Sequence, residues 1–350
     1  MGLSFSQKYH YNSQMKSDQI NSIAIMRTSA LGDIIWTLPM LNRIRKAYPN
    51  AKIYYITSNT FAPLIEGIED IELIKIDKPK KLKDYFKLKR VFAPYNFDVL
   101  LCTQANLRIN FIYPFIKAKR KIGFDSKRGR DLQKVFTSES IPFKKEHSVN
   151  AFLGFSDYLG IESKEIEFNL PYKKEEISQL PSDNFIVIHP KASSLQRTWP
   201  TKSYIELINH IEDNLKLSIV LTGVPSDKDI CDTIEKESKA NIINLCGRTT
   251  LNELKNVFLK SKMVIAPDSG PAHMAAALNR PVIGLYTAVP PEYTGPFGQI
   301  DNCINAYPRA LKKYFHKSPA EVPWRFRVKE DDMMDLISVE EVFDKVSSIL

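Results

Sequence analysis

An acid, a serine, a glycine and a histidine lie within six residues, where an apolar segment gives way to a run of alanines. They are Asp268, Ser269, Gly270 and His273, in the stretch "APDSGPAHMAAALNRPVIGLYTA". The apolar residues before them (263–266) predict a buried strand, and the small residues after them (272–279) predict a helix. Free backbone N–H groups at the start of such a helix suit a phosphate. The stretch therefore predicts an anion-binding turn, with an ordinary helix cap and a solvent-facing histidine as the alternative.

A second constellation lies near the N-terminus, in "TSALGD", which follows an apolar strand predicted over 22–27. Asp33 ends this segment and precedes a helical pattern that continues to Ala47. The carboxyl end of a parallel strand is where ligands of such sheets bind, so Asp33 is a candidate site residue. The neighbouring Thr28 and Ser29 could bond ligand oxygens, and Gly32 lets the backbone approach a ligand closely. The alternative for Asp33 is a helix N-cap.

The elements that must position these residues form two successive sets of alternating strands and helices. The first set ends with a helix that stops at Gly160, and the second begins with an apolar strand at 185–190. A polar stretch with two prolines lies between them. A chain of 350 residues is long for one core, so the alternation predicts two doubly wound α/β domains. We predict a polar N-terminal extension over 1–20, one domain over 21–175, and a second domain over 176–350 that ends in an amphipathic helix.

The chain has a net charge of +9, which predicts an acidic partner. Nucleic acid, an anionic membrane surface and a phosphorylated substrate are the candidates. No helix-turn-helix, zinc-finger or RNA-binding signature accompanies the charge, so we predict no nucleic acid. Basic residues cluster at 78–90 and at 117–130, and we interpret the first cluster as the solvated face of an amphipathic helix. No apolar run is long enough to span a bilayer.

Several chemistries are disfavoured by what the sequence lacks. The four cysteines are far apart without metal-ligand spacing, so we expect a reduced, cytoplasmic compartment and no metal site. The N-terminus has no apolar core of a secretory signal. Neither predicted domain opens with G-x-G-x-x-G after its first strand, which argues against a nicotinamide dehydrogenase. The acidic run at 330–335 is interpreted as a surface feature.

Four motifs, in their order and spacing, resemble glycosyltransferase family 9, the bacterial ADP-heptose:lipopolysaccharide heptosyltransferases. They are "RTSALGDIIWTLPML" (27–41), "RKIGFDSKRGRD" (120–131), "HPKASSLQRTWP" (189–200) and the stretch that begins at Ala266. The likeness extends over nearly the whole chain after residue 20. It implies a GT-B fold, in which two Rossmann-like domains face each other across a cleft. It also implies inverting sugar transfer without a metal ion or another cofactor.

The resemblance implies that the C-terminal domain binds the nucleotide sugar ADP-heptose. Its donor-binding signature matches Asp268, Ser269, Gly270 and His273, with Ser269 in place of the usual threonine. The further donor-binding residues are Ser193 and Ser194 near the phosphates, Arg197 or its rival Lys191 as the cation, and Asp227 at the ribose. A metal-free enzyme needs such donors because the leaving diphosphate develops negative charge.

The resemblance assigns the acceptor to the N-terminal domain, with Asp33 matching the family's proposed base. The acceptor-binding residues it implies are Thr28, Ser29, Gly32, Arg108, Arg128 and Arg130. The implied acceptor is Kdo-bearing lipid A or another part of the acidic inner core, which agrees with the positive charge of the chain. The expected location is the cytoplasm, in peripheral contact with the inner face of the bacterial inner membrane.

Two alternatives stay open at this point. One is a GT-B glycosyltransferase that uses another nucleotide sugar or modifies a protein. The other is a nucleotide-binding module that has lost catalysis, although the presence of Asp33, Gly32, Asp268 and His273 argues against it.

Overall fold

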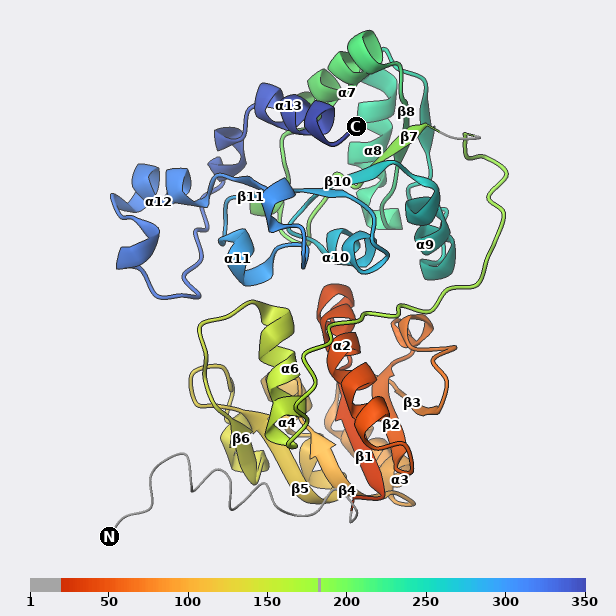
Figure 1. The fold of residues 1–350 in the computed structure, drawn as a ribbon, viewed down its shortest axis with the longest axis vertical. Helices are drawn as coiled ribbons and strands as arrows, with labels where there is room; N and C mark the ends of the chain where they lie inside the picture. The colour runs from red at the N-terminus through yellow and green to blue at the C-terminus, as the bar shows by residue number, and fades with distance from the viewer. Residues whose placement is uncertain (1–19, 182–183) are drawn as a thin grey trace. The chain divides into compact units, whose positions relative to one another are not determined.

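The computed structural model describes residues 20–181 and 184–350, which divide into two compact units. Unit 1 extends to Lys145 and includes Val149–Pro171, and unit 2 consists of Glu146–Ser148 and Tyr172–Leu350. All but the last residue of the predicted extension over 1–20 lies outside the described residues. Each unit is described by itself below (Figure 1).

Within the described residues, unit 1 contains a six-stranded parallel sheet in the order β3-β2-β1-β4-β5-β6. The strands are β1 (Ser22–Met26), β2 (Lys52–Ser58), β3 (Ile71–Ile76), β4 (Asn96–Leu101), β5 (Lys117–Phe124) and β6 (Glu139–Ile141). This is the Rossmann order, in which the direction of winding reverses between the first and the fourth strand. Ligands of such sheets bind at the carboxyl ends of those two strands, which here are β1 and β4.

Helices connect the strands of unit 1. They are α2 (Leu31–Ala47), α3 (Leu82–Phe92), α4 (Leu107–Asn110), α5 (Gln133–Phe136) and α6 (Ser148–Tyr158), with short 3₁₀ turns η2 (Ala62–Leu64) and η3 (Tyr113–Phe115). Helices α2 and α6 pack together, since Arg43 of α2 pairs with Asp157 of α6. Helices α3 and α4 instead share a hydrophobic core with Ala24 and Met26 of β1, to which they contribute Phe92 and Ile109. Right-handed crossovers in opposite winding directions place these two groups of helices on opposite faces of the sheet.

Unit 2 repeats this topology within the described residues, in the order β12-β11-β10-β7-β8-β9. The strands are β7 (Phe185–Ile188), β8 (Ser218–Leu221), β9 (Ile242–Asn244), β10 (Met263–Pro267), β11 (Val282–Tyr286) and β12 (Ile304–Asn305). The connecting elements are η4 (Leu195–Arg197), α7 (Thr201–Leu215), η5 (Pro225–Asp227), α8 (Lys228–Glu237), α9 (Leu251–Lys260), α10 (Gly270–Ala277), α11 (Pro291–Thr294) and η6 (Ile300–Asn302). The last elements are α12 (Tyr307–Phe315), η7 (Pro319–Glu321), η8 (Met333–Leu336) and α13 (Val339–Ile349). The reversal of winding now lies between β7 and β10.

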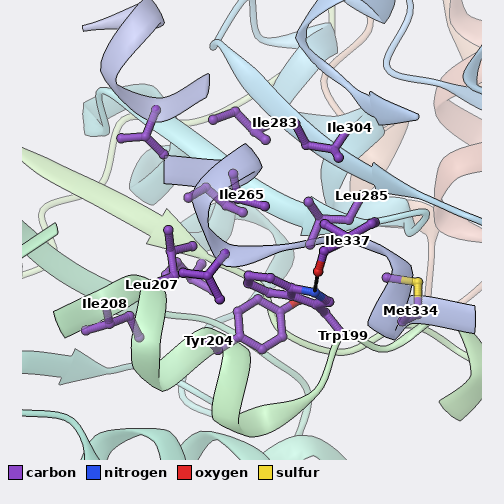
Figure 2. Close-up of a cluster of buried hydrophobic side chains, with 14 of the residues drawn as sticks. Trp199, Tyr204, Leu207, Ile208, Ile265, Ile283, Leu285, Ile304, Met334 and Ile337 are labelled. Atoms are coloured by element: carbon purple, nitrogen blue, oxygen red, sulfur yellow. Dashed lines mark hydrogen bonds between the residues drawn. The ribbon is translucent and has the colours of Figure 1, made fainter. Parts of the chain in front are cut away.

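The core of unit 2 fixes the loop that follows β7. Trp199, near the end of this loop, is buried, and its ring packs edge-on against Tyr204 of α7 at 5.0 Å (Figure 2). Its indole Nε1 donates a hydrogen bond to the carbonyl of Ile337 at 3.1 Å, drawn as a dashed line in Figure 2. The Tyr204 hydroxyl donates to the carbonyl of Pro190 at the other end of the loop. The loop is therefore anchored at both ends.

The α/β class and the two doubly wound sheets confirm the predicted fold class. The second basic cluster, 117–130, contains strand β5, which the sequence pattern did not reveal because lysines alternate along it. The predicted helix over 272–279 begins two residues earlier, at Gly270. No helix among the described residues is long and apolar enough to cross a membrane.

Candidate functional site

Asp33 lies at the carboxyl end of β1, as the third residue of α2. Its Oδ2 accepts the backbone N–H of Ala30 at 3.0 Å, and the same oxygen pairs with Nη2 of Arg27 at 2.5 Å. Asp33 therefore does bond the N-terminus of α2, as a helix-capping role requires. Both contacts fall on Oδ2, and Oδ1 has no hydrogen-bond partner among the described residues. The side chain is 30% exposed, so Oδ1 is available to accept a proton.

Arg27 orients this carboxylate and was missing from the site predicted from sequence. Its Nε donates to the carbonyl of Ser29 at 2.7 Å, and its Nη1 donates to the carbonyl of Thr103 at 2.5 Å. The guanidinium lies over the ring of Phe152, 5.4 Å from its centre. All three guanidinium nitrogens are thus engaged, and the side chain is only 11% exposed. A charged residue directly after an apolar strand was the available signal.

Gln104 is a second residue that sequence reasoning missed. It is buried just beyond β4, and its Oε1 accepts both the N–H and the hydroxyl of Thr28, at 2.8 and 2.9 Å. Its Nε2 donates to the hydroxyl of Ser29 at 3.3 Å. Gln104 therefore ties the loop after β1 to the loop after β4. The Thr28 side chain is therefore occupied by a hydrogen bond within unit 1. Gly32 is the buried second residue of α2.

In unit 2 the predicted donor residues gather at the carboxyl ends of β7 and β10. These strands are neighbours, so the loops that follow them start side by side. Arg197 joins the two loops, since its Nη1 donates to the carbonyl oxygen of Asp268 at 2.9 Å and to Oδ2 of Asp268 at 2.7 Å. Its Nη2 donates to the hydroxyl of Ser193 at 2.6 Å. Because Trp199 is anchored in the core two residues later, Arg197 is held in this position.

The turn at the start of α10 brings together the four residues of the quoted stretch. Asp268 is buried, and its Oδ1 lies 4.0 Å from Nε2 of the buried His273. Ser269 is the N-cap residue of α10, and its Oγ is buried without a hydrogen-bond partner among the described residues. The helix begins at Gly270, so its first free N–H groups are next to that hydroxyl. An oxyanion is the natural partner for such a group of donors.

Lys191 and Asp227 form a second ion pair nearby. Lys191 Nζ lies 3.2 Å from Oδ1 of Asp227 and donates to the carbonyl of Ser226 at 2.9 Å. Asp227 is buried at the N-terminus of α8, where its Oδ2 accepts the N–H of Val224. This pair lies at the end of β8, the neighbour of β7 in the sheet. The Ser194 carbonyl accepts bonds from its own loop, and no side-chain bond joins Ser194 to the other donor residues in the described part of the chain.

The three predicted acceptor arginines have different surroundings. Arg128 is buried in its loop, where its Nε pairs with Asp125 and its Nη2 donates to the carbonyl of Pro142 at 2.6 Å. Arg108 and Arg130 are exposed, and no ion pair engages either of them within the described residues. Arg128 is thus built into the fold, whereas the guanidinium groups of Arg108 and Arg130 have no ion-pair partner in the part of the chain that the structure describes.

Among the described residues, no group of three or more His, Cys, Asp or Glu side chains is arranged to hold a metal ion. The two cations among the predicted donor-binding residues, Arg197 and Lys191, are each paired with a carboxylate.

Comparison with known proteins gives one family. The family model described as glycosyltransferase family 9 (heptosyltransferase) matches residues 85–324. The chain is similar to the lipopolysaccharide core heptosyltransferase OpsX of Haemophilus influenzae, with 31% identity over 340 residues that cover 94% of this chain and 96% of that protein.

Two solved structures are similar in fold. One is a glycosyl transferase family 9 protein from Veillonella parvula, with a TM-score of 0.78, 20% identity, and coverage of 96% of this chain and 99% of that one. The other is E. coli heptosyltransferase WaaC with ADP-2-deoxy-2-fluoro heptose, with a TM-score of 0.68, 19% identity, and coverage of 94% and 100%. The shared fold is GT-B, with two Rossmann-like domains.

Proposed function

Because the chain belongs to glycosyltransferase family 9, it is a glycosyltransferase, and we propose that it transfers heptose from ADP-heptose to the inner core of lipopolysaccharide, on a Kdo or a heptose acceptor. The name of the Haemophilus relative supports the acceptor, and the ligand of the WaaC structure supports the donor. We further propose that transfer inverts the anomeric configuration and needs no metal ion.

The observation that carries this proposal is the group around the N-terminus of α10. Arg197, Asp268 and the buried hydroxyl of Ser269 meet there at the carboxyl ends of two neighbouring strands. The diphosphate would bind the helix N–H groups and the Ser269 hydroxyl, with Arg197 offsetting the negative charge that develops on the leaving group. Arg197 forms a planar pair with carboxylate or phosphate, so it can exchange one for the other. Asp268 would then hold hydroxyls of the transferred sugar.

In this proposal Asp33 is the general base. As the acceptor hydroxyl attacks the anomeric carbon of the heptose, Oδ1 of Asp33 accepts its proton, and the bond from that carbon to the ADP oxygen breaks. Arg27 and the Ala30 N–H hold the other carboxylate oxygen, so the base has one orientation. Unit 1 thus supplies the base, and unit 2 supplies the groups that stabilise the leaving diphosphate.

The exposed Arg108 and Arg130 are the acceptor-binding arginines in this proposal, because carboxylates and phosphates of the inner core can pair with them. Arg128 would act indirectly, by ordering the loop that carries Arg130. We propose that the protein works in the cytoplasm, in peripheral contact with the inner face of the inner membrane, where a lipid-linked acceptor is found.

A nucleotide panel and a transfer assay test the proposal together. ADP should raise the melting temperature, because it binds the folded state, and UDP and GDP should raise it much less. With ADP-heptose and Kdo-lipid A, mass spectrometry should detect the heptosylated product in the presence of EDTA, and NMR should show the inverted anomeric configuration. Equal stabilisation by all three nucleotides would contradict the ADP-heptose donor. Activity that EDTA abolishes and magnesium restores would contradict metal independence.

A further inference from the structure

Exposed apolar side chains are concentrated on one part of unit 1. Of the twelve large hydrophobic residues that are exposed in the described part of the chain, seven lie between residues 82 and 135. Leu82 is 81% exposed and Val135 is 71% exposed. Single exposed apolar residues are common, but several together mark a surface that binds something. The first basic cluster, interpreted from sequence as the solvated face of an amphipathic helix, lies in the same segment as some of these exposed apolar side chains.

These residues belong to elements that touch one another. The ring of Tyr85 in α3 packs against that of Phe111, just beyond α4, with 6.5 Å between the ring centres. Phe111 packs in turn against Phe136 of α5, with 5.5 Å between the ring centres. The N–H of Leu107 in α4 bonds the carboxylate of Asp131, just before α5. Leu82 and Phe86 are four residues apart in α3 and so share one side of that helix, next to Tyr85. The three helices form one continuous surface.

This surface, which we call the α3–α5 surface, lies on the outer side of the layer that covers one face of the unit 1 sheet. The inner side of the layer is filled by Leu88, Phe92 and Ile109, which belong to the hydrophobic core. The outward apolar side chains of the α3–α5 surface are Leu82, Phe86, Leu107, Phe111, Leu132 and Val135. They are therefore not needed for the core of unit 1.

The α3–α5 surface is also strongly basic. Between Lys78 and Arg90 the sequence has seven lysines and arginines and one acid, Asp84. The Asp84 carboxylate accepts the N–H groups of Lys80 and Lys81 at the start of α3, so it serves the helix terminus. Three further exposed cations are Arg108 of α4, Arg130 in the loop before α5, and Lys134 of α5. Burial and then the nearby charge of Arg108 lower the pKa of Lys78, which agrees with a high local density of positive charge.

We propose that the α3–α5 surface binds a lipid bilayer that carries anionic headgroups. Leucine, valine and phenylalanine would enter the boundary between headgroups and acyl chains, while the surrounding lysines pair with lipid phosphates. This inference rests on the proposed function, because a lipid-linked acceptor is the reason why the protein would meet a membrane. A second copy of the chain is a poor occupant, because two surfaces of the same positive charge repel. Single-stranded nucleic acid uses aromatic stacking platforms, whereas most of these apolar side chains are aliphatic.

Vesicle binding tests the proposal without donor or acceptor. The full chain should co-sediment with vesicles of phosphatidylcholine and phosphatidylglycerol and bind pure phosphatidylcholine vesicles much more weakly. The variant Leu82→Ser/Phe86→Ser should partition onto the vesicles roughly tenfold or more weakly, because it removes apolar side chains that would enter the bilayer. Lys83→Gln/Lys87→Gln should lose a similar factor, and high salt should reduce binding of the wild type. All four residues are exposed, so these variants should fold.

Matched controls lie elsewhere on the chain. Ile166→Ser/Tyr172→Ser removes two other exposed apolar side chains, and Lys236→Gln/Lys239→Gln removes two exposed lysines of α8 and the residues after it. Both should bind anionic vesicles like the wild type. Normal vesicle binding by Leu82→Ser/Phe86→Ser would overturn the proposal. The proposal would also be overturned if this variant kept its vesicle binding but lost a salt-dependent dimer or a tight RNA complex that the wild type forms.

The result is separable from the proposed function. A protein that binds anionic vesicles but transfers no heptose would refute the proposed reaction and leave the membrane surface standing. A protein that transfers heptose normally to a water-soluble acceptor fragment but does not bind anionic vesicles would refute only the proposed membrane-binding role of the α3–α5 surface.

Discussion

Arg27 and Asp33 form an ion pair across the turn that joins β1 to α2, with 2.5 Å between Nη2 and Oδ2. Two backbone carbonyls hold the arginine, and the Ala30 N–H shares the same carboxylate oxygen. The carboxylate is therefore oriented by its environment, while its Oδ1 has no partner within the described residues. Helix capping and proton acceptance can thus belong to two different oxygens of one side chain.

Replacing Asp33 by asparagine separates these two roles. The amide oxygen of Asp33→Asn can still accept the Ala30 N–H, so the melting temperature and ADP affinity should stay near wild type. Turnover should fall roughly a hundredfold or more, which is the usual contribution of a general base. The turnover number is measured by steady-state kinetics with saturating ADP-heptose.

The matched control is Glu253→Gln in unit 2. Glu253 is the third residue of α9, and its carboxylate accepts the N–H of Thr250, as Asp33 accepts that of Ala30. This variant should keep normal turnover. If Asp33→Asn folds and transfers sugar at the wild-type rate, Asp33 is a cap and no catalyst.

Arg27 should act through Asp33. A lysine at this position has a single ammonium and cannot bond the Ser29 carbonyl, the Thr103 carbonyl and Asp33 in the same planar geometry. We expect Arg27→Lys to lower kcat about tenfold with an unchanged KM for ADP-heptose, which indicates loss of orientation at the reacting group. Arg27→Gln should lower kcat further.

A double-mutant cycle distinguishes positioning from a general structural effect. In the Asp33→Asn background, Arg27→Lys should change kcat very little, because the group it orients no longer reacts. Full multiplication of the two losses would show that Arg27 acts independently of Asp33. Melting temperatures of the four proteins report any loss of stability separately.

The acceptor arginines should give two different phenotypes. Arg108→Ala and Arg130→Ala remove exposed charges, so they should raise the KM for the acceptor, leave ADP affinity unchanged and lose their effect in high salt. Arg128→Ala should instead cost on the order of 3 kcal/mol of stability, because Asp125, whose side chain is only 13% exposed, loses the guanidinium group that pairs with it. Acceptor kinetics and urea unfolding separate these results. Normal acceptor kinetics for Arg108→Ala/Arg130→Ala would show that both are surface charges only.

Much of the fold could be predicted from sequence because both sheets are parallel and buried. Strands such as Phe185–Ile188 and Met263–Pro267 are continuous apolar runs, and the helices between them show helical spacing of apolar residues. Strand β5 was missed, because its alternating lysines follow the pattern of a charged loop. Strand β12 is only two residues long and has no pattern to detect.

The site was predictable where one motif carries it and not where distant segments meet. Asp268 and Ser269 are adjacent in sequence, so their turn could be recognised. The contacts of Gln104 with Thr28 join residues 76 positions apart, and the ion pair of Arg197 with Asp268 spans 71. Such pairings depend on the order of strands in the sheet. The burial of Arg128 was likewise invisible in a run of basic residues.

Two buried histidines of unit 2 should make the protein sensitive to mild acid. His189 lies just beyond β7, its Nδ1 is 3.2 Å from the Thr222 hydroxyl, and burial lowers its pKa from 6.5 to about 4. His147 bonds the carbonyl of Gly295 through Nε2 at 2.9 Å, and burial, partly offset by this bond, lowers its pKa to about 4. Both imidazoles are neutral in the folded protein at pH 7.

The sign of the effect follows from proton uptake by the unfolded chain. Below pH 6.5 an unfolded histidine binds a proton that the folded one does not, so the free energy of unfolding falls as the pH drops from 6.5 towards 4. Above 6.5 neither state is protonated and the full stability is present. Between pH 7 and pH 5 each histidine should lower the free energy of unfolding by about 2 kcal/mol, because the slope between the two pKa values is about 1.4 kcal/mol per pH unit.

Variants that cannot titrate isolate this contribution. An asparagine at position 189 can still bond Thr222, and a glutamine at position 147 can still donate to the Gly295 carbonyl. The loss of stability between pH 7 and pH 5, measured by urea unfolding, should shrink by about 2 kcal/mol in His189→Asn and again in His147→Gln. Identical pH dependence in the wild type and both buried variants would mean that these histidines are protonated as readily in the folded chain as in the unfolded one.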